Sequence, residues 1–318
     1  MIFSSKATPR WHRVVAGFLA AAALSIVASC GGGTSQYAAF VPKRLIVFGD
    51  DLSALAQNGR KYAVNGLDAN SAVDCTAEPI WVQSMAALYG FAFAECNPNA
   101  VAEPQALMRA FAGAKVADVT AQVEAQVAAG GFRDKDLATV LVGMNDLLEL
   151  YAQFPGRAEP DLAAEAGARG RQLAAVVNRL VGLGVKVVLS DLPDLGLAPL
   201  AQKQATLSGD PDRAALLTRL TTAFNEQLGV NVVPDGRFVG LVQSQLRFQA
   251  IARSPASFGL TNISSGACTV PLPLCTTATL VTDAQAGSYL WADDTRLSSG
   301  GQKQLATLGL DRAQRNPF

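Results

Sequence analysis

The chain has 318 residues with 26 basic and 26 acidic side chains, and half of its residues are hydrophobic. Such a charge balance, without a basic patch, excludes the electrostatic footprint of a nucleic-acid-binding protein. The length and apolar content suffice to bury one large core, so one folded domain is the simplest organisation.

The first 29 residues have the features of an export signal. Three basic residues precede an apolar run at 14–26, which is too short to span a bilayer as a stable helix. The run leads into Val27-Ala28-Ser29-Cys30, which resembles the bacterial lipobox. The resemblance implies cleavage before Cys30 and acylation of that residue. The mature chain would then carry a net charge of −3, since the removed segment holds three basic residues and no acidic one.

A lipid anchor at Cys30 makes the membrane the first expected partner. No acidic residue follows Cys30 directly, which by resemblance to sorted lipoproteins favours the outer membrane, facing the periplasm or the surface. An ordinary signal peptide with a chance cysteine is the alternative. We therefore divide the chain into a lipoprotein signal peptide at 1–29, a tether at 30–42 and a folded domain at 43–318.

From Arg44 onward, apolar strands alternate with amphipathic helices, a pattern typical of a parallel sheet covered on both faces. We expect strands at 45–48, 137–142, 185–189 and 238–242. We expect helices at 80–89, 165–183, 210–228 and 299–315, and one that follows the last strand and continues to Ala252.

Four cysteines remain once Cys30 is set aside. An even number in an oxidising compartment favours two disulfides over a metal site, and the residues lack zinc-ligand spacing. Cys268 and Cys275 bracket a short proline-containing loop that a local bridge would close. Cys75 and Cys96 are then paired by elimination.

Several short motifs stand in an order that resembles the GDSL/SGNH hydrolases, in particular their secreted lipase/esterase branch. The first block appears as Gly49-Asp50-Asp51-Leu52-Ser53 after a strand, and the third is intact as Gly143-Met144-Asn145-Asp146. The last block aligns with Asp293-Asp294-Thr295-Arg296-Leu297-Ser298. Between the third and last blocks lie further segments similar to the family, at 192–199, 224–228, 255–262 and 289–291.

The resemblance implies a three-layer α/β/α sandwich around a mostly parallel, five-stranded sheet in flavodoxin-like order. It also implies an esterase site, but two positions depart from it. Asp51 stands where the family has its nucleophilic serine, and Arg296 stands where it has the histidine base. The single histidine, His12, lies within the predicted signal peptide. An arginine stays protonated and cannot serve as the base.

The remaining site residues are Asp293, Asn145 and Gly113. By resemblance, Asn145 and the backbone of Gly113 would belong to the oxyanion hole, although Asn145 is also suited to tying the loop after its strand. Ser53 is a conceivable displaced nucleophile, but a serine at the start of a helix is the simpler interpretation. Without a serine and a base, we expect no catalytic residues in the Ser-His-Asp sense.

The two departures are complementary in charge. We predict that Asp51 lies at a helix N-terminus and forms a salt bridge with Arg296, which also reaches Asp293. Two other interpretations of the acidic residues are a glycosidase-like carboxylate pair and a site for a hard cation. The clustered residues for these would be Asp50, Asp51, Asp146, Asp293 and Asp294. A neighbouring arginine disfavours a divalent metal, so we expect neither metal nor cofactor.

The sequence therefore predicts a catalytically degenerate, SGNH/GDSL-hydrolase-like envelope lipoprotein. As a pseudoenzyme it would bind a small molecule or a protein in the vestigial cleft, and no nucleic acid. One alternative is a carboxylic-ester hydrolase with rearranged catalytic residues. Another is a structural envelope lipoprotein without a ligand.

Overall fold

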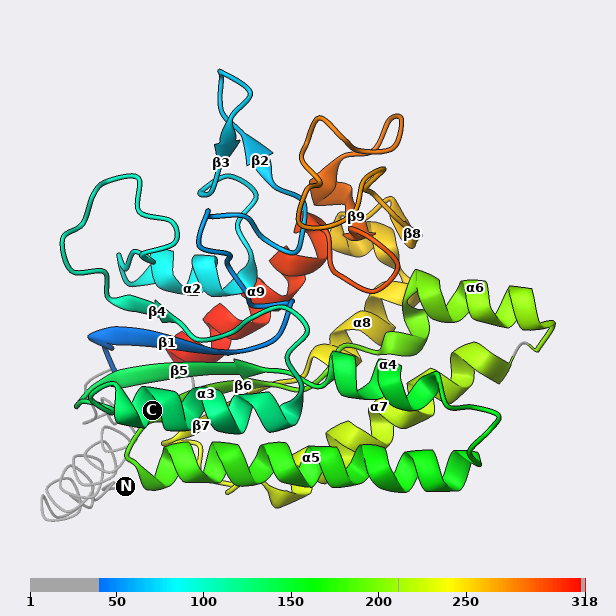
Figure 1. Cartoon of the computed structure of the whole chain (residues 1–318), viewed down its shortest axis with the longest axis horizontal. Coiled ribbons are helices and arrows are strands. Elements are labelled where there is room, and N and C mark those ends of the chain that lie inside the picture. The colour runs from blue at the N-terminus through cyan, green and yellow to red at the C-terminus, as the bar shows by residue number, and fades with distance from the viewer. Residues whose placement is uncertain (1–39, 211, 316–317) are drawn as a thin grey trace, which may run out of the picture. The chain divides into compact units, whose positions relative to one another are not determined.

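A sheet of five parallel strands forms the centre of the computed structural model, which describes residues 40–210, 212–315 and 318 (Figure 1). The strand order is β4-β1-β5-β6-β7, the flavodoxin-like order in which the second strand lies outside the first. The bounds are Arg44–Gly49 for β1, Ala106–Met108 for β4, Asp136–Leu141 for β5, Lys186–Ser190 for β6 and Val239–Val242 for β7.

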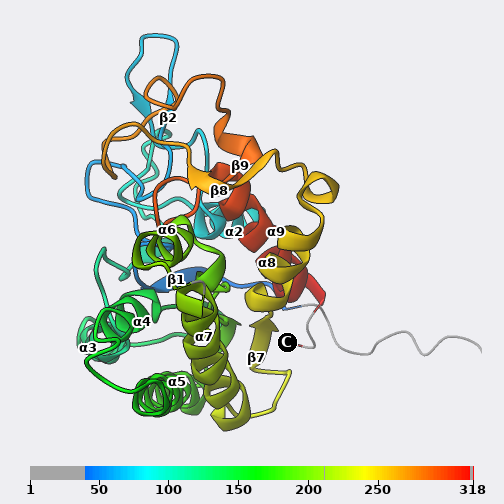
Figure 2. The same ribbon diagram turned by 90° about the vertical axis from the view of Figure 1, so that its right-hand side faces the viewer.

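Helices cover both faces of this sheet, as Figures 1 and 2 show. One layer contains α3, α5 and α7, and the other contains α2 and α9. Shorter helices α4, α6 and α8 follow individual strands. The three-layer α/β/α prediction is confirmed. The bounds are Trp81–Leu88 for α2, Val116–Ala128 for α3, Met144–Tyr151 for α4, Glu159–Gly182 for α5, Pro199–Ser208 for α6, Asp212–Asn231 for α7, Ser244–Arg253 for α8 and Ser299–Arg315 for α9.

The strands and helices that the sequence predicted are present, with one notable difference in length, whereas helices α3, α4 and α6 were not predicted. The fifth helix begins at Glu159 instead of Glu165, because Pro160 is accepted in the first turn, where its missing N–H is not needed. Strand β4 was not predicted, because a three-residue edge strand carries too little periodicity to recognise.

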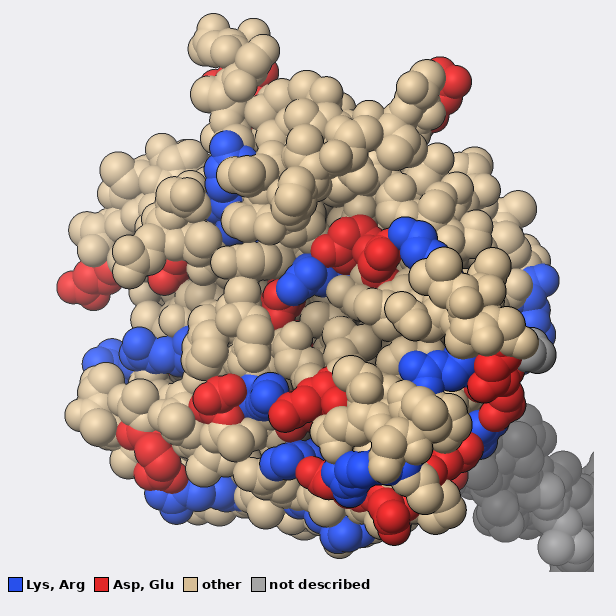
Figure 3. All heavy atoms as spheres, turned by 45° about the vertical axis from the view of Figure 1, so that its right-hand side comes forward, with Lys and Arg blue, Asp and Glu red and all other residues tan. Residues whose placement is uncertain are grey.

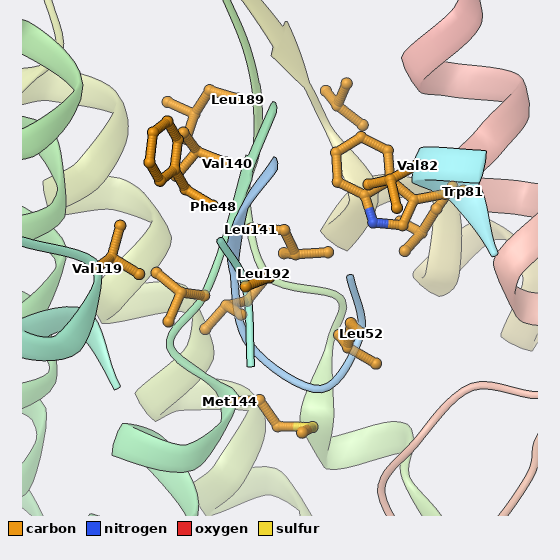
Figure 4. Packing of buried hydrophobic residues seen from close by; sticks show 14 of the residues in the cluster. Phe48, Leu52, Trp81, Val82, Val119, Val140, Leu141, Met144, Leu189 and Leu192 are labelled. Carbon is orange, nitrogen blue, oxygen red and sulfur yellow. The ribbon is translucent and has the colours of Figure 1, made fainter. Parts of the chain in front are cut away.

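The core follows from the alternation of side chains along the strands. Phe48, Val140 and Leu189 lie on one side of the sheet, together with Val119 of α3 (Figure 4). Leu141 lies on the side of Trp81 in α2 (Figure 4), and all these side chains are buried. Strands buried on both faces explain why their sequences are continuous apolar runs.

Two small sheets lie side by side beyond the central sheet (Figure 1). One pairs β2 (Gly66–Leu67) with β3 (Val73–Asp74), and the other pairs β8 (Asn262–Gly266) with β9 (Tyr289–Trp291). The disulfides Cys75–Cys96 and Cys268–Cys275 hold the adjoining loops, which confirms both predicted pairings.

Buried polar side chains connect the two stapled loops. The ammonium of Lys61, which is fully buried, donates hydrogen bonds to the carbonyls of Cys75, Ala77 and Glu78. The amide of Asn65 donates to the carbonyls of Pro273 and Cys275, each at 3.0 Å. Because each buried donor is satisfied by backbone carbonyls, this junction stays polar without an energetic penalty from unpaired groups.

The predicted signal peptide at 1–29, Cys30 and the tether as far as residue 39 lie outside the described residues. Residues 40–318 make up one compact unit. Among the residues that the structure describes, no helix has both the length and the apolar character needed to cross a membrane.

Candidate functional site

The site residues lie at the carboxyl ends of three neighbouring strands. Asp51 follows β1, Gly113 follows β4 and Asn145 follows β5. Strand β1 lies between β4 and β5. The connection after β1 runs to β4 on one side of it, and the connection after β4 returns to β5 on the other side. This topological switch point is where open α/β sheets generally place their ligands.

Two glycines allow close packing at the strand ends that carry Asp51 and Asn145. Gly49 has φ +149°, and a Cβ there would lie 2.2 Å from the carbonyl oxygen of Leu141. Gly143 has φ +126°, and a Cβ there would lie 2.7 Å from the ring of Phe224. A side chain at Gly49 would therefore push β1 away from β5, and one at Gly143 would clash with Phe224 and displace the turn that leads to Asn145.

The carboxylate of Asp51 is held at both oxygens. Its Oδ1 accepts a hydrogen bond from Nε of Arg296 at 2.7 Å. Its Oδ2 accepts from the backbone N–H of Gly113 at 2.7 Å and from Nδ2 of Asn145 at 3.0 Å. The side chain of Asp51 is 1% exposed. The two predicted oxyanion donors thus converge on a single oxygen atom, and that atom belongs to Asp51.

Arg296 joins the first and last blocks, so the predicted Asp51–Arg296 salt bridge is confirmed. Its Nη1 also donates to Oδ2 of Asp293 at 3.0 Å, and its backbone N–H donates to Oδ1 of Asp293 at 2.6 Å. The side chain of Arg296 is 29% exposed. The arginine therefore contacts both acids from one fixed position while its edge still reaches solvent.

The prediction that Asp51 lies at a helix N-terminus is wrong. Residues 51–53 form a turn, and no described helix begins there. Ser53, predicted as a helix-start serine, lies in the same turn. Its Oγ is fully buried and accepts a hydrogen bond from Nε1 of Trp81 at 3.0 Å, so it cannot meet a substrate.

The role of Asn145 is broader than the loop tie that the sequence suggested. Its Nδ2 donates to Asp51 and also to the carbonyl of Ala114 at 3.0 Å. The residue lies in the first turn of α4. One amide therefore connects the strand ends of β1, β4 and β5.

Electrostatics favour the ionised form of Asp51. Burial opposes ionisation, but the hydrogen bond from Asn145, the charge of Arg296 and the hydrogen bond from Gly113 together hold the pKa of Asp51 below its usual value. Burial likewise opposes the charge of Arg296, yet Asp51 and then Asp293 raise its pKa above the usual value. The pair is a true ion pair at neutral pH.

Two of the acidic residues named from the sequence, Asp146 and Asp294, have other partners. Oδ2 of Asp146 accepts a hydrogen bond from the backbone N–H of Val116 at 2.9 Å and so caps α3. Oδ1 of Asp146 also forms an ion pair with Nε of Arg169 at 3.8 Å. Asp294 pairs with Lys203. Within the described residues, no group of three or more acidic, cysteine or histidine side chains could hold a metal ion. Asp146 and Asp294 thus have partners of their own outside the Asp51–Arg296 pair.

Sequence reasoning missed the residues that position the Asp51 turn. Gln122 of α3 accepts from the N–H of Gly49 and donates to its carbonyl, both at 2.9 Å. Gln302 of α9 donates to the carbonyl of Leu52 at 3.1 Å and accepts from the N–H of Trp81. No sequence motif contains these two glutamines. Their role depends on the packing of α3 and α9 against opposite faces of the sheet.

Asp50 is fully buried beside the ion pair. Its Oδ1 accepts a hydrogen bond from the N–H of Leu52, and its Oδ2 has no hydrogen-bond partner among the described residues. Burial, and next the charge of Asp51, raises the pKa of Asp50 from 3.8 to about 8. Asp50 is therefore a neutral acid at pH 7, behind the anionic Asp51.

This raised pKa predicts a pH effect on stability. The folded state holds the Asp50 proton up to about pH 8, whereas the unfolded chain releases it near 3.8. Stability should therefore fall as the pH rises through this window. Asn mimics the protonated acid, so Asp50→Asn should reduce the decline, with a gain over the wild type on the order of a few kcal/mol at pH 8. Urea unfolding at pH 5, 7 and 8 measures it, and parallel pH curves for both proteins would contradict the assignment.

Charged side chains of both signs are interleaved over the face shown in Figure 3. Lys and Arg lie next to Asp and Glu there, and neither sign forms an extended patch. Recognition at this face would therefore depend on individual polar groups and shape, with little contribution from a long-range field.

Comparison with known proteins identifies the fold. No protein family described by a sequence profile matches the chain, and no curated protein matches it. The lipase Lip_vut3 from a goat rumen metagenome is 14% identical and matches over 86% of this chain and 98% of its own, with a TM-score of 0.50. The acetyl xylan esterase AlAXEase is 14% identical over 84% of this chain and 98% of its own, with a TM-score of 0.44.

A G-D-S-L family lipolytic protein from Veillonella parvula is 13% identical over 84% of this chain and 96% of its own, with a TM-score of 0.43. At such identities the likeness to the lipase shows the fold alone. Together with the strand order, it shows the SGNH-hydrolase fold that the motifs led us to expect. Activity does not follow from it, because one fold carries many functions.

Proposed function

We propose that this protein is a non-hydrolytic envelope lipoprotein on the SGNH-hydrolase fold that binds a ligand or partner at its vestigial site. The observation that carries the proposal is the position of the Asp51 carboxylate. It replaces the nucleophilic hydroxyl and also satisfies the N–H of Gly113 and the amide of Asn145, the donors that an ester oxyanion would need.

The chemistry of the neighbouring groups supports this proposal. Arg296 stands at the position of the base, and a guanidinium does not accept a proton at neutral pH. Asp51 itself is a poor nucleophile, because both of its oxygens are engaged and its pKa lies below the usual value. A rearranged hydrolase would need a nucleophile and base elsewhere.

The site nevertheless reaches solvent, which favours a binding role over a purely structural one. Gly113 is exposed, and Arg296 keeps part of its guanidinium accessible. A ligand could therefore approach the bridge without displacing the core.

An esterase assay tests the proposal. The purified mature domain should not hydrolyse p-nitrophenyl acetate or butyrate above the rate of its Asp51→Ala variant. It should also remain unlabelled by a fluorophosphonate probe, which requires an activated serine. An active serine hydrolase of known titre, treated in parallel, controls for reagent quality. Turnover in the wild type that survives Asp51→Ala would favour the rearranged hydrolase.

The envelope part of the proposal has a separate test. The lipobox-like Val27-Ala28-Ser29-Cys30 motivates it, and two disulfides agree with export to an oxidising compartment. Cells fed an alkyne fatty acid should incorporate the label into the wild type and not into Cys30→Ser, which should leave the membrane fraction. An unlabelled wild type would end the lipoprotein proposal and leave the ordinary signal peptide.

A further inference from the structure

The donors around Asp51 have a geometry that suits a whole carboxylate group. A single oxyanion would need donors converging on one atom only. Here, one oxygen receives two N–H donors, from Gly113 and Asn145, and the other receives Nε of Arg296. Three donors divided between two oxygens of a planar group resemble the way proteins recognise a free carboxylate.

Each donor is positioned by contacts that do not involve Asp51. Asn145 is held by the carbonyl of Ala114 at 3.0 Å. Arg296 is held by Asp293, through its backbone N–H and through Nη1. Gly113 follows β4 in the backbone turn that leads to α3. The receptor should therefore persist when the Asp51 side chain is absent.

Charge favours the same conclusion. With Asp51 removed, the guanidinium of Arg296 keeps Asp293 as its acidic partner among the described residues, and the donors of Gly113 and Asn145 are left without an anion. An anion of matching shape would restore these hydrogen bonds and the ion pair with Arg296, so one that fits should be bound.

We propose that Gly113, Asn145 and Arg296 form a carboxylate-binding site whose ligand in the native chain is the side chain of Asp51. The site takes a small monocarboxylate when that side chain is removed. This inference rests on the proposed non-hydrolytic site, and it names the chemical group that the donors of that site recognise. In the native chain the tethered Asp51 carboxylate acts at high effective concentration, so a free carboxylate does not displace it.

Chemical rescue of stability tests the proposal. Asp51→Ala removes one carbon and two oxygens, the atoms of formate, and Asp51→Gly leaves room for acetate. Both variants should lose thermal stability. Sodium formate should then raise the Tm of Asp51→Ala saturably, by roughly 2–4 °C over sodium chloride at equal ionic strength. Acetate should act on Asp51→Gly more than on Asp51→Ala, because only the glycine variant accommodates the extra methyl group.

Three matched proteins control for nonspecific salt effects. The wild type and Asp51→Asn, in which the pocket stays filled, should show no difference between formate and chloride. Asp51→Ala combined with Arg296→Gln should lose the formate effect, because the donor to the second oxygen is gone. Equal Tm shifts in formate and chloride, or an effect that survives Arg296→Gln, would overturn the inference. If either single variant fails to fold, the other still provides the comparison.

The outcome is separable from the test of the proposed function. Rescue is a stability measurement that involves no turnover. If the wild type shows no esterase activity and formate does not stabilise Asp51→Ala, only the carboxylate-site proposal is wrong. If the wild type hydrolyses esters, the non-hydrolytic proposal itself is wrong.

Discussion

The variant Asp51→Ser/Arg296→His should hydrolyse short acyl esters, at roughly 10²-fold or more above its own nucleophile-free control. The physical reason lies in the hydrogen-bond donors that the proposed vestigial site keeps. Gly113 and Asn145 already bind an oxygen at 2.7 and 3.0 Å, and removing the Asp51 carboxylate frees them for an oxyanion. Asp293 precedes Arg296 by three residues and would orient the introduced imidazole.

The control for this gain is Asp51→Ala/Arg296→His, which has the base without the nucleophile. Initial rates on p-nitrophenyl acetate, together with fluorophosphonate labelling, measure the effect. Circular dichroism should first show that both variants are folded, because both lack the bridge. Equal rates in the two folded variants would mean that the turn at Asp51 does not present a hydroxyl to the cleft, and that the site has diverged beyond its two visible departures.

Breaking the ion pair should destabilise the protein. Replacing Arg296 should lower the free energy of unfolding by more than replacing Asp51. Arg296→Ala leaves the Asp51 carboxylate, which is 1% exposed, without its cation. We expect a loss of about 2–4 kcal/mol, less than for a fully buried pair because the arginine is partly exposed. Asp51→Ala should cost about 1–3 kcal/mol, since Arg296 keeps Asp293 and access to water.

The double variant Asp51→Ala/Arg296→Ala should cost less than the two single losses together, with a coupling on the order of 1–2 kcal/mol. Urea unfolding at pH 7 measures the cycle. Because the pKa of Asp51 is lowered, its contribution is present above its unfolded value and is lost as the pH falls through its folded value. The coupling should therefore shrink in acid. Additive losses at pH 7 would show that the bridge contributes nothing beyond its separate groups.

Much of the fold could be predicted because the long elements have strong local signals. The apolar runs of β1 and β5 are continuous, and α9 has the bounds that the sequence predicted. The two disulfides were predicted from the even number of cysteines, the oxidising compartment expected for an exported protein and the short loop between Cys268 and Cys275. Strand β4 was not predicted, because it is a strand by virtue of its pairing with β1 and its short sequence has no strand pattern of its own.

The candidate site divides along the same line. Sequence by itself determined which residue types stand at the site: an aspartate for the serine, an arginine for the histidine, and no histidine after residue 12. Their opposite charges, at two positions that the family resemblance places face to face, predicted the bridge. These conclusions depend on residue identity within short motifs, so they needed no coordinates.

Only the tertiary structure decided what the second oxygen of Asp51 does. Gly113 is 62 positions from Asp51 in the chain, and Arg296 is 245 positions away. Whether such distant groups share one carboxylate depends on how the strand ends align and on turns held by helices from both layers. Burial of Ser53 against Trp81 was decided in the same way. The strength of a hydrogen bond changes when the donor–acceptor distance changes by a few tenths of an ångström. Only the packing of the folded chain sets distances with that accuracy.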